Sequence, residues 1–185
     1  MKFHKNVLFP DMYLDSIFKI EYEELFNRGM RGLVYDIDNT LAEIDRPEPN
    51  ERLIVLFDGL KEMGYGICLL SNNSEGRVQR FNEKLKLHAI HRAAKPRSRG
   101  IKKAISLLGT DEKNTVIVGD QIFTDVWCGK SHGLYTILVR PVAKKDELIV
   151  TAKRWPEKIV LALYQRKARR EREKDDCLEK RQRLR

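Results

Sequence analysis

The segment GLVYDIDNTL, residues 32–41, decides the fold predicted for this chain. An apolar run at 33–35 leads directly into Asp36 and Asp38. Burying a carboxylate is costly unless it is paired, hydrogen-bonded or bound to a metal ion. Either a strand ends at these aspartates, or the aspartates belong to a functional site, and the rest of the sequence has to separate the two interpretations.

Residues 31–140 alternate between short β-rich runs and segments with helical periodicity. The β-rich runs predict strands at 32–36, 65–71, 87–92, 115–119 and 135–140. Apolar residues recur at helical spacing within 53–60, 78–85 and 101–108, and Gly64 and Gly109 stand where helices are expected to end. This alternation predicts an α/β fold, with a central parallel sheet covered by helices on both faces.

Polar side chains follow four of the predicted strands. They are Asp36, Asp38 and Thr40 after the first strand, Ser71 and Asn72 after the second, Lys95 after the third, and Asp120 and Asp125 after the fourth. Ligands of open parallel sheets bind beyond the carboxyl ends of the strands, near the point where strand order reverses. We therefore expect these side chains to converge on one site.

Such a set of side chains suits phosphoryl transfer. Asp36 and Asp120 can supply the carboxylates that Mg²⁺ prefers, together with water and a phosphate oxygen. An ionised Asp36 can attack phosphorus and form an aspartyl-phosphate, while Asp38 acts as general acid and base. Ser71 and Lys95 provide donors for the charge on the transferred phosphoryl oxygens.

In this order, DIDNTL, Ser71, Lys95-Pro96 and GDQIFTD resemble the four motifs of the haloacid dehalogenase-like (HAD) phosphohydrolase superfamily, over about residues 31–140. The resemblance implies a Rossmann-like HAD fold and an Mg²⁺-dependent phosphatase. By position, it makes Asp36 the nucleophile and a metal ligand, Asp38 the acid/base with its carbonyl on the metal, and Asp120 the other metal carboxylate.

Four further roles follow from the same resemblance. Thr40 is expected to brace the loop that carries the two aspartates, and Asn72 to contact phosphate beside Ser71 and Lys95. Asp125 either holds a metal-bound water or orients a neighbouring side chain. Thirty residues separate Thr40 from Ser71, and twenty-three separate Ser71 from Lys95, so no cap domain fits in either gap.

A narrower resemblance covers about residues 8–141. LFPDMYLDSIFKI, LLSNN and LVRP, together with the motifs above, resemble the YqeG family of capless HAD phosphatases, which is similar to the mitochondrial phosphatidylglycerophosphate phosphatase of fungi. This implies dephosphorylation of phosphatidylglycerophosphate to phosphatidylglycerol. Two alternatives stay open: a phosphatase of nucleic acid ends or phosphoproteins, and an RNA- or ribosome-associated binding protein with vestigial catalysis.

The sequence predicts three parts: residues 1–30 as an extension packing on the domain, 31–150 as the phosphatase domain, and 151–185 as a basic helix or tail. Residues 153–185 hold thirteen Lys or Arg against six Asp or Glu, which is most of the net charge of +9. This tail suits an anionic membrane surface, RNA or the ribosome, or only solvent.

The scattered cysteines Cys68, Cys128 and Cys177 favour a reducing compartment. The first fifteen residues lack the pattern of a secretory signal. We therefore expect a cytoplasmic protein. If its substrate is a lipid, we expect the protein to bind peripherally at the inner face of the membrane. The sequence does not indicate an oligomeric state.

Overall fold

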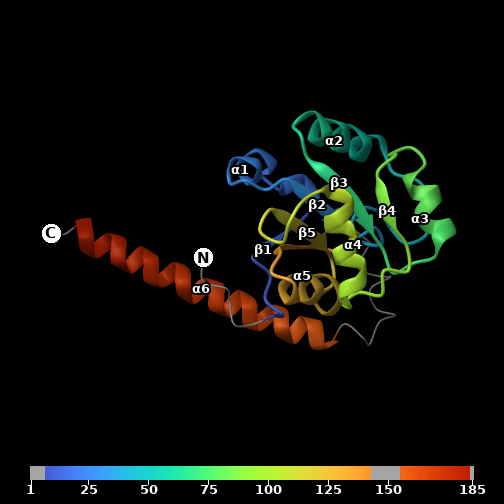
Figure 1. Cartoon of the computed structure of the whole chain (residues 1–185). Coiled ribbons are helices and arrows are strands. Elements are labelled where there is room, and N and C mark those ends of the chain that lie inside the picture. Colours follow the sequence, from blue (N-terminus) through green and yellow to red (C-terminus); the bar gives the residue numbers. More distant parts are fainter. Residues whose placement is uncertain (1–6, 143–154, 184–185) are drawn as a thin grey trace. The chain divides into compact units, whose positions relative to one another are not determined.

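The computed structural model describes residues 7–142 and 155–183 (Figure 1). The chain divides into two units, residues 1–148 and 149–185. The first holds all the strands that the structure describes, and the second is described by one helix, α6 (Trp155–Arg183). The predicted boundary at 150–151 lies outside the described residues.

The first unit is built on a six-stranded sheet in the order β1-β6-β5-β2-β3-β4, and every neighbouring pair is parallel. The strands are β1 (Met12–Leu14), β2 (Gly32–Tyr35), β3 (Gly66–Leu70), β4 (His88–Ile90), β5 (Thr115–Gly119) and β6 (Tyr135–Val139). The chain runs outward from β2 to β4 and then crosses back to β5 on the other side of β2. Strand order therefore reverses between β2 and β5, where ligands of such sheets bind.

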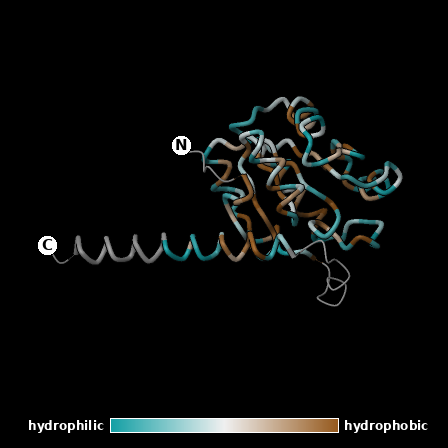
Figure 2. Tube along the Cα trace, turned by 90° about the horizontal axis from the view of Figure 1, so that it is seen from below, coloured by the Kyte–Doolittle hydropathy of each residue, from teal (hydrophilic) through white to brown (hydrophobic). Residues whose placement is uncertain are grey.

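Two apolar clusters flank the sheet, because successive side chains of a strand point to opposite faces. Leu33 and Tyr35 of β2 pack in the cluster with α1 (Tyr22–Asn27), α2 (Glu51–Glu62) and α3 (Glu75–Asn82). Val34 packs in the other cluster, with α4 (Ser98–Leu108) and α5 (Trp127–Ser131). Figure 2 shows stretches of hydrophobic residues running through the middle of the first unit. The predicted parallel sheet with helices on both faces is confirmed.

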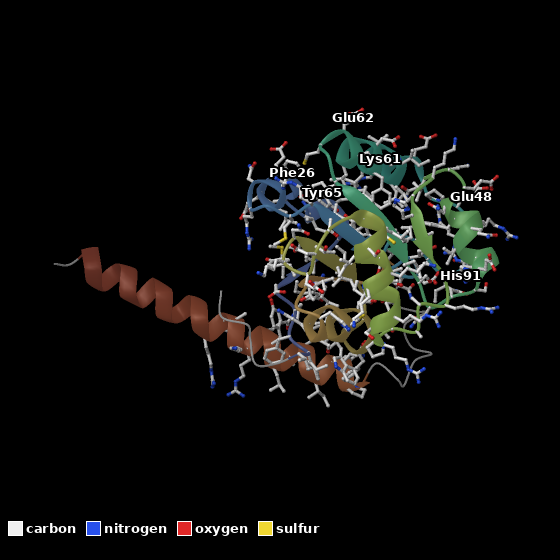
Figure 3. All side chains as sticks on the ribbon, in the orientation of Figure 1. Phe26, Glu48, Lys61, Glu62, Tyr65 and His91 are labelled. Atoms are coloured by element: carbon white, nitrogen blue, oxygen red, sulfur yellow. The ribbon has the colours of Figure 1, made fainter. Side chains whose placement is uncertain are left out.

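Residues before position 31 join the sheet and its core. β1 is an edge strand beside β6, and it is followed by the short helix η1 (Ile17–Lys19). The Tyr22 hydroxyl of α1 donates to the Ile17 carbonyl and accepts from the Tyr35 hydroxyl, at 3.0 and 2.8 Å. Phe26 meets Tyr65 edge to face at 5.2 Å between ring centroids (Figure 3). The sequence did not predict β1, which is short and pairs with a strand far along the chain.

The segments between the predicted site residues are short. Between Thr40 and Ser71 the chain forms α2 and β3, and between Ser71 and Lys95 it forms α3 and β4. These segments leave no room for an inserted cap domain. Gly64 and Gly109 have positive φ angles of 97° and 62°, Gly64 just after the α2 cap Met63 and Gly109 directly after α4, which confirms the predicted helix ends. Within the described residues, no helix is long and apolar enough to cross a membrane.

Candidate active site

Two neighbouring strands place Asp36 and Asp120 together. Asp36 follows β2, its backbone N–H donates to the Val118 carbonyl of β5 at 2.9 Å, and Asp120 follows β5 directly. Both carboxylates are buried, with 7% and 6% of the residue exposed. The Thr40 hydroxyl lies 3.3 Å from Asp120 Oδ1 and 3.5 Å from Asp36 Oδ2, so it links the two acids.

A tight turn after β2 presents the next residues. The backbone N–H groups of Thr40 and Leu41 donate to the Ile37 carbonyl, and that of Asn39 donates to the Ala42 carbonyl. Asn39 takes a left-handed conformation with φ of 63°, which asparagine tolerates better than most residues. The turn brings the Thr40 hydroxyl back to the carboxylates of Asp36 and Asp120, while the Asp38 side chain stays 18% exposed.

Lys95 joins two of the aspartates. Its ammonium donates to Asp36 Oδ1 and to Asp125 Oδ1, both at 2.6 Å, and the lysine side chain is only 3% exposed. Burial alone would lower the pKa of Lys95, but the attraction of Asp125 and Asp36 raises it above its ordinary value. Lys95 is therefore a fixed positive charge. Both predicted roles of Asp125, holding a metal-bound water and orienting a neighbour, stay predictions, and its observed side-chain partner is Lys95.

The π-helical turn η2 (Ile122–Val126) places Asp125 under the end of β5. Asp125 Oδ2 accepts from the Gln121 backbone N–H at 3.1 Å. A Cβ atom on Gly119 would lie 2.2 Å from Asp125 Cγ, so this position of the strand has room only for glycine. The glycine of the GDQIFTD motif thus allows Asp125 to reach Lys95.

We expect Gly119→Ala to displace the Asp125 carboxylate, because the added methyl group cannot fit beside it. The substitution should destabilise the protein by about 1–3 kcal/mol, the usual cost of overpacking, and should lower kcat as Lys95 loses its support. Urea unfolding and phosphatase assays would measure the two effects. Gly59→Ala is the matched control, since Gly59 lies in α2 and a Cβ added there would point into open space. Equal stability of the Gly119 variant and wild type would contradict the steric argument.

The aspartates carry more negative charge than Lys95 balances. Carboxylate oxygens of Asp36, Asp120 and Asp125 lie within 4.8 Å of one another, and all three residues are buried. Burial raises the pKa of Asp36 from 3.8 to about 7; attraction to Lys95 opposes this, and repulsion by Asp125 and Asp120 adds to it. Oxygen donors with excess negative charge suit a hard divalent cation, so these residues could hold a metal ion.

The Ser71 and Asn72 side chains lie beside Lys95. Ser71 is buried, and its hydroxyl accepts from the Asn73 backbone N–H at 3.0 Å. The Asn72 side chain makes two hydrogen bonds to the Lys95 backbone: its Oδ1 accepts from the N–H at 2.7 Å, and its Nδ2 donates to the carbonyl at 3.2 Å. Asn72 thus holds the Lys95 loop, a contact that the sequence did not predict.

Asp38 has partners of its own. Arg77 donates to Asp38 Oδ1 from Nε and Nη2, at 3.2 and 3.0 Å, and Asn73 Nδ2 donates to Oδ2 at 3.1 Å. Sequence reasoning missed both donors. The only signal was position: Asn73 directly follows Ser71-Asn72, and Arg77 comes within the first turns of the helix after it.

The site opens into a cavity of about 330 Å³ at the ends of the strands. Its lining joins five of the predicted residues with three that were not predicted: Asp36, Asp38, Ser71, Asn72 and Lys95, and then Asn73, Gln121 and Thr124. The other three predicted residues do not line the cavity but contact residues of the site: Thr40 contacts Asp36 and Asp120, and Asp125 contacts Lys95. The structure therefore brings all eight predicted residues to one place.

Comparisons with known proteins agree with this geometry. A family model of HAD-hydrolase-like proteins matches residues 92–165. The probable phosphatase YqeG of Bacillus subtilis is 39% identical over 88% of this chain and 95% of its own. The chloroplastic phosphatidylglycerophosphate phosphatase 1 of Chlamydomonas reinhardtii is 26% identical over 78% of this chain, but only 57% of its own length is covered.

The solved structures show the same fold at low identity. The crystal structure of a HAD phosphatase from Thermococcus onnurineus has a TM-score of 0.52 and 14% identity, covering 63% of this chain and 89% of that one. Together, fold and relatives define a HAD-like phosphatase, a phosphoric monoester hydrolase. The chain belongs to the YqeG family of these enzymes.

Proposed function

We propose that this phosphatase uses Mg²⁺, works through an aspartyl-phosphate on Asp36, and acts on phosphatidylglycerophosphate. The observation that supports the chemistry best is that the two aspartates have different partners: buried Asp36 pairs with Lys95, while the partly exposed Asp38 pairs with Arg77. Two carboxylates in different environments can take different roles, one as nucleophile and one as acid/base.

In the first step, a carboxylate oxygen of Asp36 attacks phosphorus as the bond from phosphorus to the ester oxygen breaks. Asp38 gives its proton to that leaving oxygen. In the second step, water attacks the phosphorus of the aspartyl-phosphate, Asp38 takes the proton, and the bond from phosphorus to Asp36 breaks, which releases phosphate. Lys95 and Ser71 donate to the phosphoryl oxygens.

Asp36 and Asp120 would hold Mg²⁺ through their carboxylates, which lie close together. The backbone carbonyl of Asp38 would add a further oxygen ligand. When bound, the ion would neutralise charge on the phosphoryl group and keep Asp36 ionised. This second effect matters here, because burial without a metal raises the pKa of Asp36 to about 7.

The substrate proposal rests on relatives. Phosphatidylglycerophosphate phosphatases of Chlamydomonas reinhardtii and Arabidopsis thaliana are 26% and 27% identical to this chain. A site without a cap suits a phosphate carried on a bulky lipid. Such a substrate lies at a membrane surface, and α6 offers exposed Ile159 and Leu163 within a strongly basic sequence, a combination suited to anionic lipid.

The test is phosphate release from phosphatidylglycerophosphate in anionic mixed micelles with Mg²⁺. p-Nitrophenyl phosphate and a 3′-phosphorylated oligonucleotide serve as comparators. We expect kcat/KM for the lipid to exceed that for either comparator by at least about tenfold, and all activity to disappear on chelation. Added salt should slow the lipid reaction more than the aryl reaction if the basic helix binds the surface.

The other outcomes separate the alternatives. Preference for the oligonucleotide would replace the lipid with nucleic acid ends as substrate. Activity on the aryl phosphate alone would keep the chemistry and remove the lipid. Absence of activity on all three, together with salt-sensitive RNA binding that is lost on removal of residues 165–185, would favour a binding protein with vestigial catalysis.

A further inference from the structure

Arg77 contacts a single carboxylate of the site. Its Nε and Nη2 both donate to Asp38 Oδ1, at 3.2 and 3.0 Å, from the helix α3. The arginine side chain is 12% exposed and the aspartate side chain 18% exposed, so the pair is largely shielded from solvent. An ion pair shielded in this way holds its geometry better than a surface pair.

The same guanidinium also reaches the loop that follows Asp38. Nη1 donates to the Pro47 carbonyl and Nη2 to the Glu43 carbonyl, both at 3.5 Å. The Phe81 ring lies 5.2 Å from the guanidinium carbon, one turn further along α3. Arg77 is therefore fixed by its own helix and connects that helix to both Asp38 and the 39–50 loop.

Asp38 is held at both of its oxygens. Arg77 bonds Oδ1, and Asn73 Nδ2 bonds Oδ2 at 3.1 Å, so rotation of the carboxylate would break hydrogen bonds on both sides. Lys95, in contrast, bonds Asp36 and Asp125. The site thus has two separate cations, one for each of the two aspartates to which we assign chemical steps.

We propose that Arg77 is a positioning residue for proton transfer: it holds the Asp38 carboxylate at the angle from which Asp38 exchanges a proton with the ester oxygen and with water. This inference rests on the proposed function, because it requires Asp38 to be the acid/base. Arg77 is not among the residues that line the cavity of the site.

The leaving group provides a readout specific to this role. An alkyl phosphate needs a proton on its leaving oxygen, whereas 2,4-dinitrophenolate is a stable anion that leaves without one. The ratio of kcat/KM between the two substrates reports only on the step up to cleavage of the ester bond. Loss of the proton donor should therefore affect the alkyl substrate far more, while general damage to the fold should affect both alike.

The experiment compares Arg77→Gln, Arg77→Lys and Asp38→Asn on n-butyl phosphate and 2,4-dinitrophenyl phosphate with Mg²⁺. We expect Arg77→Gln to lower kcat/KM for the alkyl substrate by about 10–100-fold and to leave the aryl value within about fivefold of wild type. Arg77→Lys should recover part of the loss. Arg80→Gln, an exposed arginine on the same helix, is the matched control and should change neither value.

A double variant separates the two levels of the proposal. In the Asp38→Asn background, Arg77→Gln should cause no further loss, since the two residues act as one unit. If Asp38→Asn itself fails to discriminate between the substrates, the acid/base assignment falls. A different result counts against Arg77 alone: Asp38→Asn lowers kcat/KM mainly for the alkyl substrate, but Arg77→Gln lowers kcat/KM equally for both substrates, or lowers it further in the double variant. In that case Arg77 does not position Asp38, and the proposed function stands.

Discussion

Asp36→Asn is expected to abolish turnover, lowering kcat by at least about 10⁴-fold, because an amide cannot attack phosphorus to form the covalent intermediate. The fold should survive. The change removes one of three clustered carboxylates and leaves Lys95 bonded to Asp125 at 2.6 Å. Thermal unfolding of the metal-free protein at pH 8 should therefore occur at or above the wild-type temperature.

Asp58→Asn is the control for this variant. Asp58 lies on α2, pairs with Lys61 at 2.9 Å and is 58% exposed, so its loss should change neither rate nor stability. Acid trapping of wild type during turnover should give a phosphoryl group stable to acid and labile to base on Asp36. A variant that keeps its rate would show that another residue is the nucleophile.

The sequence allowed prediction of most of the fold because the inner strands are unambiguous. β2, β3 and β5 are buried apolar runs bounded by turns, and each was predicted within a residue at either end. β1 was missed for a physical reason. A three-residue edge strand with half-buried side chains gains its structure from pairing with β6, some 125 positions away, and no local pattern records that pairing.

Only part of the site could be predicted in the same way. Site residues directly after strands were predicted, since parallel strands bring their carboxyl ends to the same edge. The residues that hydrogen-bond to these site residues were not predicted. Arg77 lies 39 positions after Asp38 in the sequence, and the hydrogen bonds between the Asn72 side chain and the Lys95 backbone depend on the exact path of a loop. Nothing in the spacing of the sequence distinguishes Arg77 from Arg80 on the same helix.

Lys95 carries the second large effect. Lys95→Met should destabilise the metal-free protein by about 3–5 kcal/mol at pH 8, because it leaves the buried carboxylates of Asp36 and Asp125 without their partner. It should also lower kcat by about 10²–10³-fold, since the donor to the phosphoryl oxygens is lost. Urea unfolding and steady-state kinetics measure the two quantities. Lys102→Met, on the exposed face of α4, is the matched control.

The loss of stability should depend on pH, with a sign that follows from Asp36. Its pKa is raised from 3.8 to about 7 by burial, so the folded state binds this proton more tightly than the unfolded state. The stability contributed by that proton is present below about pH 4 and is lost as pH rises through about 7. Without Lys95 the attraction that lowers the Asp36 pKa is gone, so Asp36 stays protonated to still higher pH.

At pH 5.5 the Lys95→Met protein should therefore hold Asp36 neutral, and the difference from wild type should be clearly smaller than at pH 8. Unfolding curves of both proteins at the two pH values, with chelator present, measure this difference directly. A loss of stability that is equal at both pH values would mean that Lys95 contributes packing rather than charge. The carboxylates beside Asp36 would then need no metal ion to balance their charge.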